Sequence, residues 1–141
     1  MTSEPEWLLE PVVIAIHRLL LAEHGGADGI RDRGLLSSTL ARPKNRFGYG
    51  APPPSVFDLA ASYAYGLVKN HGFVDGNKRV ALTAALTFLE LNGLHLEAPK
   101  TETYLTMIRL ASGELAEDDF SRWLATFSKP SGQRPDRASP P

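Results

Sequence analysis

Residues 71–79 form the stretch of this sequence in which side chains able to do chemistry are most concentrated; it reads HGFVDGNKR. His71 titrates close to neutral pH and is therefore the natural general base. Asp75 can hold a hard divalent cation such as Mg²⁺. Lys78 and Arg79 add positive charge and hydrogen-bond donors for phosphate oxygens. The residue types together predict a site that binds phosphate and accepts a proton.

The stretch also lies directly at the predicted start of a helix. A helix N-terminus presents unpaired N–H groups and the positive end of the helix dipole, which together suit a phosphate group. Gly76 has no side chain, so a phosphate can approach the backbone closely there. The location therefore strengthens the prediction of an anion site.

Each of these residues also has a purely structural interpretation. Asp75 and Asn77 are typical helix-capping residues, and Lys78 and Arg79 could be a solvated helix surface. A histidine at position 71 could satisfy the last carbonyls of the preceding helix. Phe73 and Val74 are expected to pack the loop against the core. The coincidence of all these residue types around one glycine favours an anion or phosphate site.

Helices must position this stretch, because hydrophobic residues recur at helical spacing along most of the chain. No stretch is convincing as a strand. The helix over 77–91 is apolar on nearly every side, which is typical of a central, buried helix. We expect an all-α fold, a compact bundle of about six helices around this central helix, with the others over about 10–24, 34–41, 56–70, 102–112 and 117–127.

Two proline-containing segments lie outside these predicted helices. Pro43 is predicted to end the second helix, and the segment from there to Pro54, with Phe47 and Tyr49, is predicted to be a loop. Residues 129–141 contain four prolines and no large apolar residue. We therefore predict one domain over residues 1–128 and a disordered tail over 129–141.

Composition narrows the class of protein. A chain of 141 residues fits one domain, and the absence of cysteine excludes disulfides and thiolate chemistry. The net charge of -1 argues against a nucleic-acid binder. No apolar run approaches the roughly 20 residues that cross a bilayer, and the acidic N-terminus is unlike a signal peptide. We expect a cytoplasmic protein with neither a membrane nor a nucleic acid as partner.

The other histidines and arginines carry weaker signals. His17 and His24 are seven residues apart, which is not a zinc-binding spacing, so a surface or packing role is expected for both. Arg31 and Arg33 could touch a ligand, but a turn capped by Asp32 at the start of the second helix is the favoured interpretation.

The stretch 71–79 resembles the signature of the Fic and Doc (Fido) superfamily, H-x-F-x-[DE]-[GA]-N-[GK]-R, at all seven specified positions. The resemblance extends over roughly residues 8–128, including GGADGIRDRGLL at 25–36. Two positions are similar to the Doc branch. AMP-transferring Fic proteins have glycine where this chain has Lys78 and a second arginine where it has Leu82.

The resemblance implies a toxin of a toxin–antitoxin system with the Fido fold. Doc-type members act as protein kinases that transfer the γ-phosphate of ATP to a threonine of elongation factor Tu, because the lysine reverses the way ATP sits. The resemblance also implies a small cognate antitoxin that docks a helix over the site. Two alternatives stay open: an AMP transferase acting on a protein hydroxyl, and a catalytically silent protein that only binds an antitoxin.

The resemblance also implies a role for each residue of the signature. His71 would be the base that takes the proton of the acceptor hydroxyl, and Asp75 would bind Mg²⁺. The ATP phosphates would be held by Gly76, Asn77, Lys78 and Arg79. The segment 46–54 would correspond to the flap that positions the target in this family.

Overall fold

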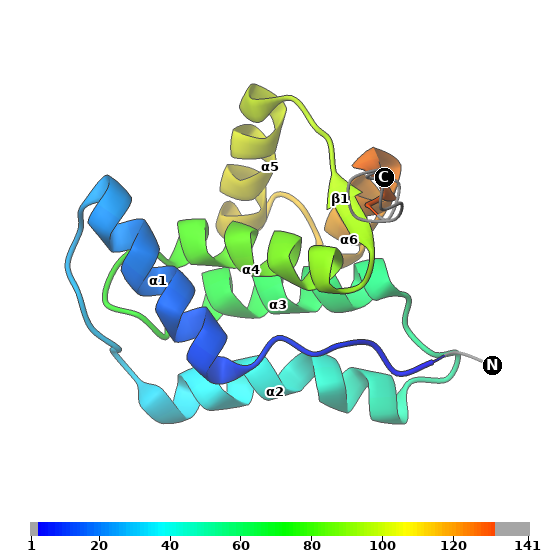
Figure 1. Ribbon diagram of the computed structural model, residues 1–141, viewed down its shortest axis with the longest axis horizontal. Helices are drawn as coiled ribbons and strands as arrows, with labels where there is room; N and C mark the ends of the chain where they lie inside the picture. Colours follow the sequence, from blue (N-terminus) through cyan, green and yellow to red (C-terminus); the bar gives the residue numbers. More distant parts are fainter. Residues whose placement is uncertain (1–2, 132–141) are drawn as a thin grey trace, which may run out of the picture.

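The computed structural model describes residues 3–131 (Figure 1). Over these residues the chain forms an all-α bundle with one small sheet, which confirms the predicted fold class. The helices are α1 (Glu10–His24), α2 (Arg33–Tyr49), α3 (Val56–Asn70), α4 (Asn77–Leu91), α5 (Lys100–Ser112) and α6 (Glu117–Phe127). The strands are β1 (Leu94–Leu96) and β2 (Ser128–Pro130). In this part of the chain no helix has the length and apolar character needed to span a membrane.

Helices α3 and α4 lie side by side through the middle of the molecule (Figure 1). In α4, Val80, Ala84 and Phe88 are fully buried, and only Lys78, Arg79 and Leu91 of this helix are exposed. The predicted central, buried helix is thereby confirmed. Because the exposed Lys78 and Arg79 stand at its first turn, α4 presents positive charge at its N-terminal end.

Helix α2 packs along α3 and continues through Pro43, so the prediction that this proline ends the helix was wrong. Arg42, one residue before the proline, forms an ion pair with Glu117 of α6 at 2.7 Å. Arg46, three residues after it, forms a second ion pair with the same carboxylate at 2.9 Å. These contacts and the burial of Pro43 stabilise the helix on both sides of the proline, where one helical hydrogen bond is lost. The loop predicted over 43–54 therefore begins only at Gly50.

Two short strands also depart from the predictions. Leu94–Leu96 pairs antiparallel with Ser128–Pro130, and the N–H of Ser131 donates to the carbonyl of Gly93 at 2.8 Å. Residues 129–131, predicted to begin a disordered tail, are therefore ordered against β1. Partner strands more than 30 residues apart leave no local sequence signal, which is why neither was predicted. The rest of the predicted tail, 132–141, lies outside the described residues.

Candidate active site

The loop 71–76 joins α3 to α4 and carries the start of the predicted site. His71 is the C-terminal cap residue of α3 and has left-handed backbone angles, φ 51° and ψ 54°. Gly76 is the N-cap of α4 and is also left-handed, with φ 79°. This second angle explains the glycine, because a side chain there would strain the backbone. The loop thus turns sharply at both ends, between two central helices.

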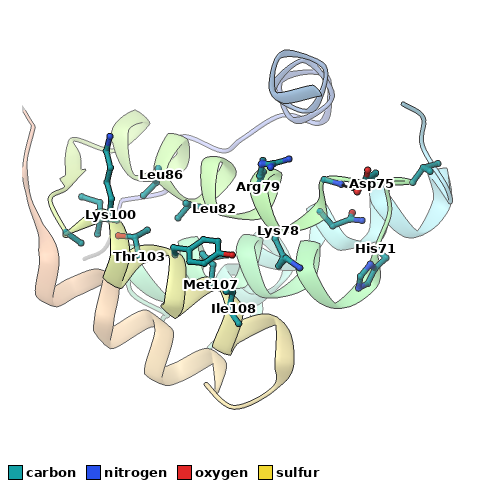
Figure 2. A pocket seen from close by; sticks show the side chains of 16 residues that line it. His71, Asp75, Lys78, Arg79, Leu82, Leu86, Lys100, Thr103, Met107 and Ile108 are labelled. Carbon is teal, nitrogen blue, oxygen red and sulfur yellow. Dashed lines mark hydrogen bonds between the residues drawn. The ribbon is translucent and has the colours of Figure 1, made fainter. Parts of the chain in front are cut away.

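An open cleft of about 690 Å³ begins at this loop and runs along α4 toward α5 (Figure 2). One end is polar, and Figure 2 shows His71, Asp75, Lys78 and Arg79 gathered there. The cleft brings together every site residue predicted from the sequence, including Gly76 and Asn77. Its far part is mostly apolar, with Lys100 beyond; the lining there includes Leu82, Leu86, Leu96, Tyr104, Met107 and Ile108. The volume falls in the range of small-molecule sites.

The first turn of α4 faces this cleft without a side-chain cap. Asp32 and Ser55 cap α2 and α3 by accepting hydrogen bonds from backbone N–H groups. In α4 the first backbone N–H with a carbonyl partner is that of Val80, which donates to Gly76. The N–H groups of residues 77–79 therefore stand at the helix start where an anion binds best.

The carboxylate of Asp75 is held by backbone N–H groups. Oδ2 accepts from Ala27 at 3.2 Å and Oδ1 accepts from Gly76 at 2.8 Å. The hydrogen bond from Ala27, then that from Gly76, lowers the pKa of Asp75 below its ordinary value, so the group is charged at neutral pH. Asp75 is not the N-cap of α4, since that position belongs to Gly76. The capping interpretation of Asp75 was therefore wrong.

Asp75 belongs to no cluster of three metal-ligating side chains among the described residues. Among residues 3–131 no three histidine or carboxylate side chains cluster closely enough to hold a metal by themselves. Mg²⁺ in phosphoryl-transfer sites is commonly held by one or two carboxylates together with substrate phosphates. One charged carboxylate beside a helix start without a side-chain cap fits that donor set.

Asn77 is buried, and its side chain belongs to the loop. Its Oδ1 accepts from the N–H of Phe73 at 3.2 Å, and its Nδ2 donates to the carbonyl of Phe73 at 3.0 Å. The amide thus satisfies both backbone groups of a residue that is itself buried. The second hydrogen of Nδ2 is not used in these two bonds. Asn77 holds the loop closed, and the alternative of a simple helix cap was wrong.

Residues 7–89 match the family model described as the Fic/DOC family, and this range contains the whole loop and the first turn of α4. The chain belongs to the Fic/DOC family. The resemblance seen in the signature is thereby confirmed.

Two relatives of this Fic/DOC chain are similar over different lengths. It is 47% identical over 75 residues to the protein named Toxin Doc of Mycolicibacterium smegmatis, covering 52% of this chain and 57% of that protein. It is 32% identical over 104 residues to the protein named Protein kinase doc of Escherichia phage P1, covering 74% of this chain and 81% of that protein. The first match thus spans little more than half the length of its relative.

In this Fic/DOC chain, the sequence analysis missed a supporting residue, His17 of α1. Its ring is buried and stacks on Phe73, with centroids 3.9 Å apart and planes 12° apart. Nε2 donates to the carbonyl oxygen of Asp75 at 2.8 Å. The predicted packing role is correct, but the partner is the signature loop itself. The only local hint was a histidine on the apolar face of a helix.

The loop also pairs with the connection between α1 and α2. The N–H of Val74 donates to the carbonyl of Gly29 at 3.0 Å, and the N–H of Arg31 donates to that of Gly72 at 2.8 Å. Ile30 and Phe73 form an isolated antiparallel bridge between these two pairs. The loop 71–76 is therefore held by α1, by the connection 25–32 and by Asn77 at the start of α4.

Proposed function

We propose that this Fic/DOC chain is a toxin that acts as a protein kinase, transferring the γ-phosphate of ATP to a threonine of elongation factor Tu. One observation carries the proposal. A histidine, a carboxylate and two cations line one end of a single cleft, over a helix start that lacks a side-chain cap. The two relatives, one named as a toxin and the other as a protein kinase, support the same activity.

The proposed reaction places the terminal phosphate at the first turn of α4. His71 accepts the proton of the threonine hydroxyl, whose oxygen forms a bond to the γ-phosphorus. The bond from that phosphorus to the oxygen bridging it to the β-phosphate breaks, and ADP leaves. Lys78, Arg79 and the backbone N–H groups of residues 77–79 stabilise the charge on the transferring group and the leaving oxygen.

A divalent cation fits this arrangement. Asp75 would hold Mg²⁺, and the ion would supply positive charge that neutralises the phosphates. The carboxylate is charged at neutral pH, and its lowered pKa extends the charged form to more acid pH. The backbone N–H groups of Ala27 and Gly76 fix the carboxylate in position.

The apolar part of the cleft supports an orientation of ATP in which the γ-phosphate lies next to His71, as in Doc-type members. Leu82 and Leu86 follow Lys78 by one and two turns on α4 and line the cleft beyond the cations. A second arginine at position 82 would extend the electropositive surface along the helix, and leucine there ends it. We infer that the terminal phosphate binds next to His71 and that the nucleoside extends toward the apolar part.

A two-label assay tests this direction. The chain is incubated with purified elongation factor Tu, Mg²⁺ and ATP labelled at either the α- or the γ-phosphate. Transfer of the γ-label alone supports the kinase. Transfer of the α-label would identify an AMP transferase instead. Absence of both labels, with elongation factor Tu shown to be intact, would favour a silent binding protein or another target.

The His71→Ala variant tests the base. It should lower transfer by about 10²–10⁴-fold and abolish growth arrest on expression, because the proposed general base is removed. His95→Ala is the matched control, since His95 is an exposed histidine of β1 that does not line the cleft. Circular dichroism should be unchanged in both variants. Full transfer by folded His71→Ala would show that another group is the base.

We further propose a small antitoxin as the partner of this chain and the cytoplasm as its location, where ATP and elongation factor Tu are found. The relative named as a toxin supports a cognate inhibitor. Co-expression of a short gene that precedes or overlaps this one should restore growth, and the two products should co-purify. Continued arrest with both proteins present would contradict that pairing.

A further inference from the structure

We propose that Arg31 is a positioning residue that holds His71 in the orientation the reaction needs. The inference rests on the proposed function, in which His71 is the base. Arg31 lies in the connection between α1 and α2, outside the signature and outside the lining of the cleft. Its role therefore has to pass through another residue.

Arg31 binds three consecutive backbone carbonyls around the base. Its Nε donates to the carbonyl of His71 at 2.6 Å, and its Nη2 donates to that of Asn70 at 2.8 Å. Its own backbone N–H donates to the carbonyl of Gly72 at 2.8 Å. The carbonyls at the end of α3 have no partner within the helix, so the guanidinium supplies one.

The His71 backbone needs such support. His71 is the one residue other than glycine with a positive φ among those the structure describes. A left-handed backbone is unfavourable for a residue with a Cβ atom and persists only where surrounding contacts hold it. Because the direction of the Cα–Cβ bond follows from the backbone angles, a relaxed φ at residue 71 would carry the imidazole away from its present place in the cleft.

The shape of the guanidinium suits this task. Its planar fork donates two hydrogen bonds in a fixed geometry, whereas a lysine ammonium acts as a single point charge. The two bonds go to neighbouring carbonyls of the helix end, where the helix dipole is negative. The side chain therefore restrains the two peptide groups that flank the Cα atom of His71.

The experiment compares Arg31→Ala and Arg31→Lys with Arg33→Ala. Arg33 is a matched control, because it is an arginine two residues away that pairs with Glu10 instead of the loop. Displacement of the base should lower kcat of Arg31→Ala by about 10–100-fold, with KM for ATP within about two-fold of the unaltered chain. Arg31→Lys should lie between the two, and Arg33→Ala should match the unaltered chain.

A second measurement is independent of transfer. In NMR spectra of chain labelled at histidine, His71 should give one sharp ring signal in the unaltered chain and Arg33→Ala, and a shifted or multiple signal in Arg31→Ala. If the unaltered chain transfers no label, the proposed function fails while this spectrum still decides the role of Arg31.

Three results would overturn the proposal. One is an unchanged kcat together with an unchanged His71 signal in Arg31→Ala. Another is a raised KM for ATP at constant kcat, because that would make Arg31 a nucleotide contact. The third is a loss of activity that only follows the unfolded fraction, because that would make Arg31 a contributor to stability alone.

Discussion

Replacement of Asn77 by alanine distinguishes a residue that builds the site from one that only binds substrate. In the structure the side-chain amide satisfies the N–H and the carbonyl of Phe73, at 3.2 and 3.0 Å. A residue whose sole role is to contact phosphate would contribute to nucleotide affinity and leave the unfolding of the ligand-free protein unchanged. Asn77→Ala should instead destabilise the ligand-free protein.

The magnitude follows from two buried backbone groups. Each polar group left without a partner costs about 1–3 kcal/mol when water is excluded, and Phe73 is only 1% exposed. Water entering the vacated space would reduce that cost, and alanine has a slightly better helix propensity than asparagine. We expect a loss of about 2–4 kcal/mol, a large part of the stability of a small domain. The melting temperature should fall by roughly 8–16 °C.

The assay is thermal and denaturant unfolding without nucleotide, followed by circular dichroism. Asn45→Ala is the matched control, because Asn45 is exposed on α2 and should change stability by less than about 0.5 kcal/mol. A melting temperature of Asn77→Ala equal to that of Asn45→Ala would refute the reasoning. It would mean that the two hydrogen bonds to Phe73 do not hold the loop.

Two further predictions concern ionised groups. The pKa of Asp75 is lowered by the N–H of Ala27 and then that of Gly76, so its contribution to stability is present above the unfolded pKa of about 3.9 and is lost as pH falls through the lower folded value. In Asp75→Asn, the free energy of unfolding in urea should therefore fall less steeply between about pH 5 and about pH 2 than in the unaltered chain. An equally steep fall in both proteins would contradict this. Glu117→Ala removes the partner of Arg42 and Arg46. In denaturant titrations the free energy of unfolding should fall by about 1–3 kcal/mol, a range that already takes account of the partial exposure of both arginines. Transfer activity should stay unchanged in this variant, because Glu117 does not line the cleft.

Much of the site could be predicted because its chemistry is contiguous. His71, Asp75 and the cations fall within nine residues at a helix start, and a helix start determines where its N–H groups and first side chains lie. The burial of α4 could likewise be predicted from its apolar residues alone. Local sequence carries such features because they depend on neighbours a few residues away.

Features that depend on distant partners could not be predicted. Around Pro43, where α2 continues, Arg42 and Arg46 bind Glu117, which lies more than 70 residues further along the chain. The contact of His17 with Asp75 joins residues 58 positions apart. Sequence alone predicts that Pro43 ends the helix and gives His17 no specific partner. Both features are explained only once the distant residues, Glu117 and Asp75, are known.

The family, the helical class and the candidate site residues could all be predicted from the sequence, because each depends on local spacing and residue type. How the loop 71–76 is held became known only from the packed helices. That packing turned Asn77 inward onto Phe73, placed His17 beneath Asp75 and brought Arg31 to the carbonyls beside His71. The physical reason is that hydrogen bonds between distant segments form only when packing of the helices brings those segments together.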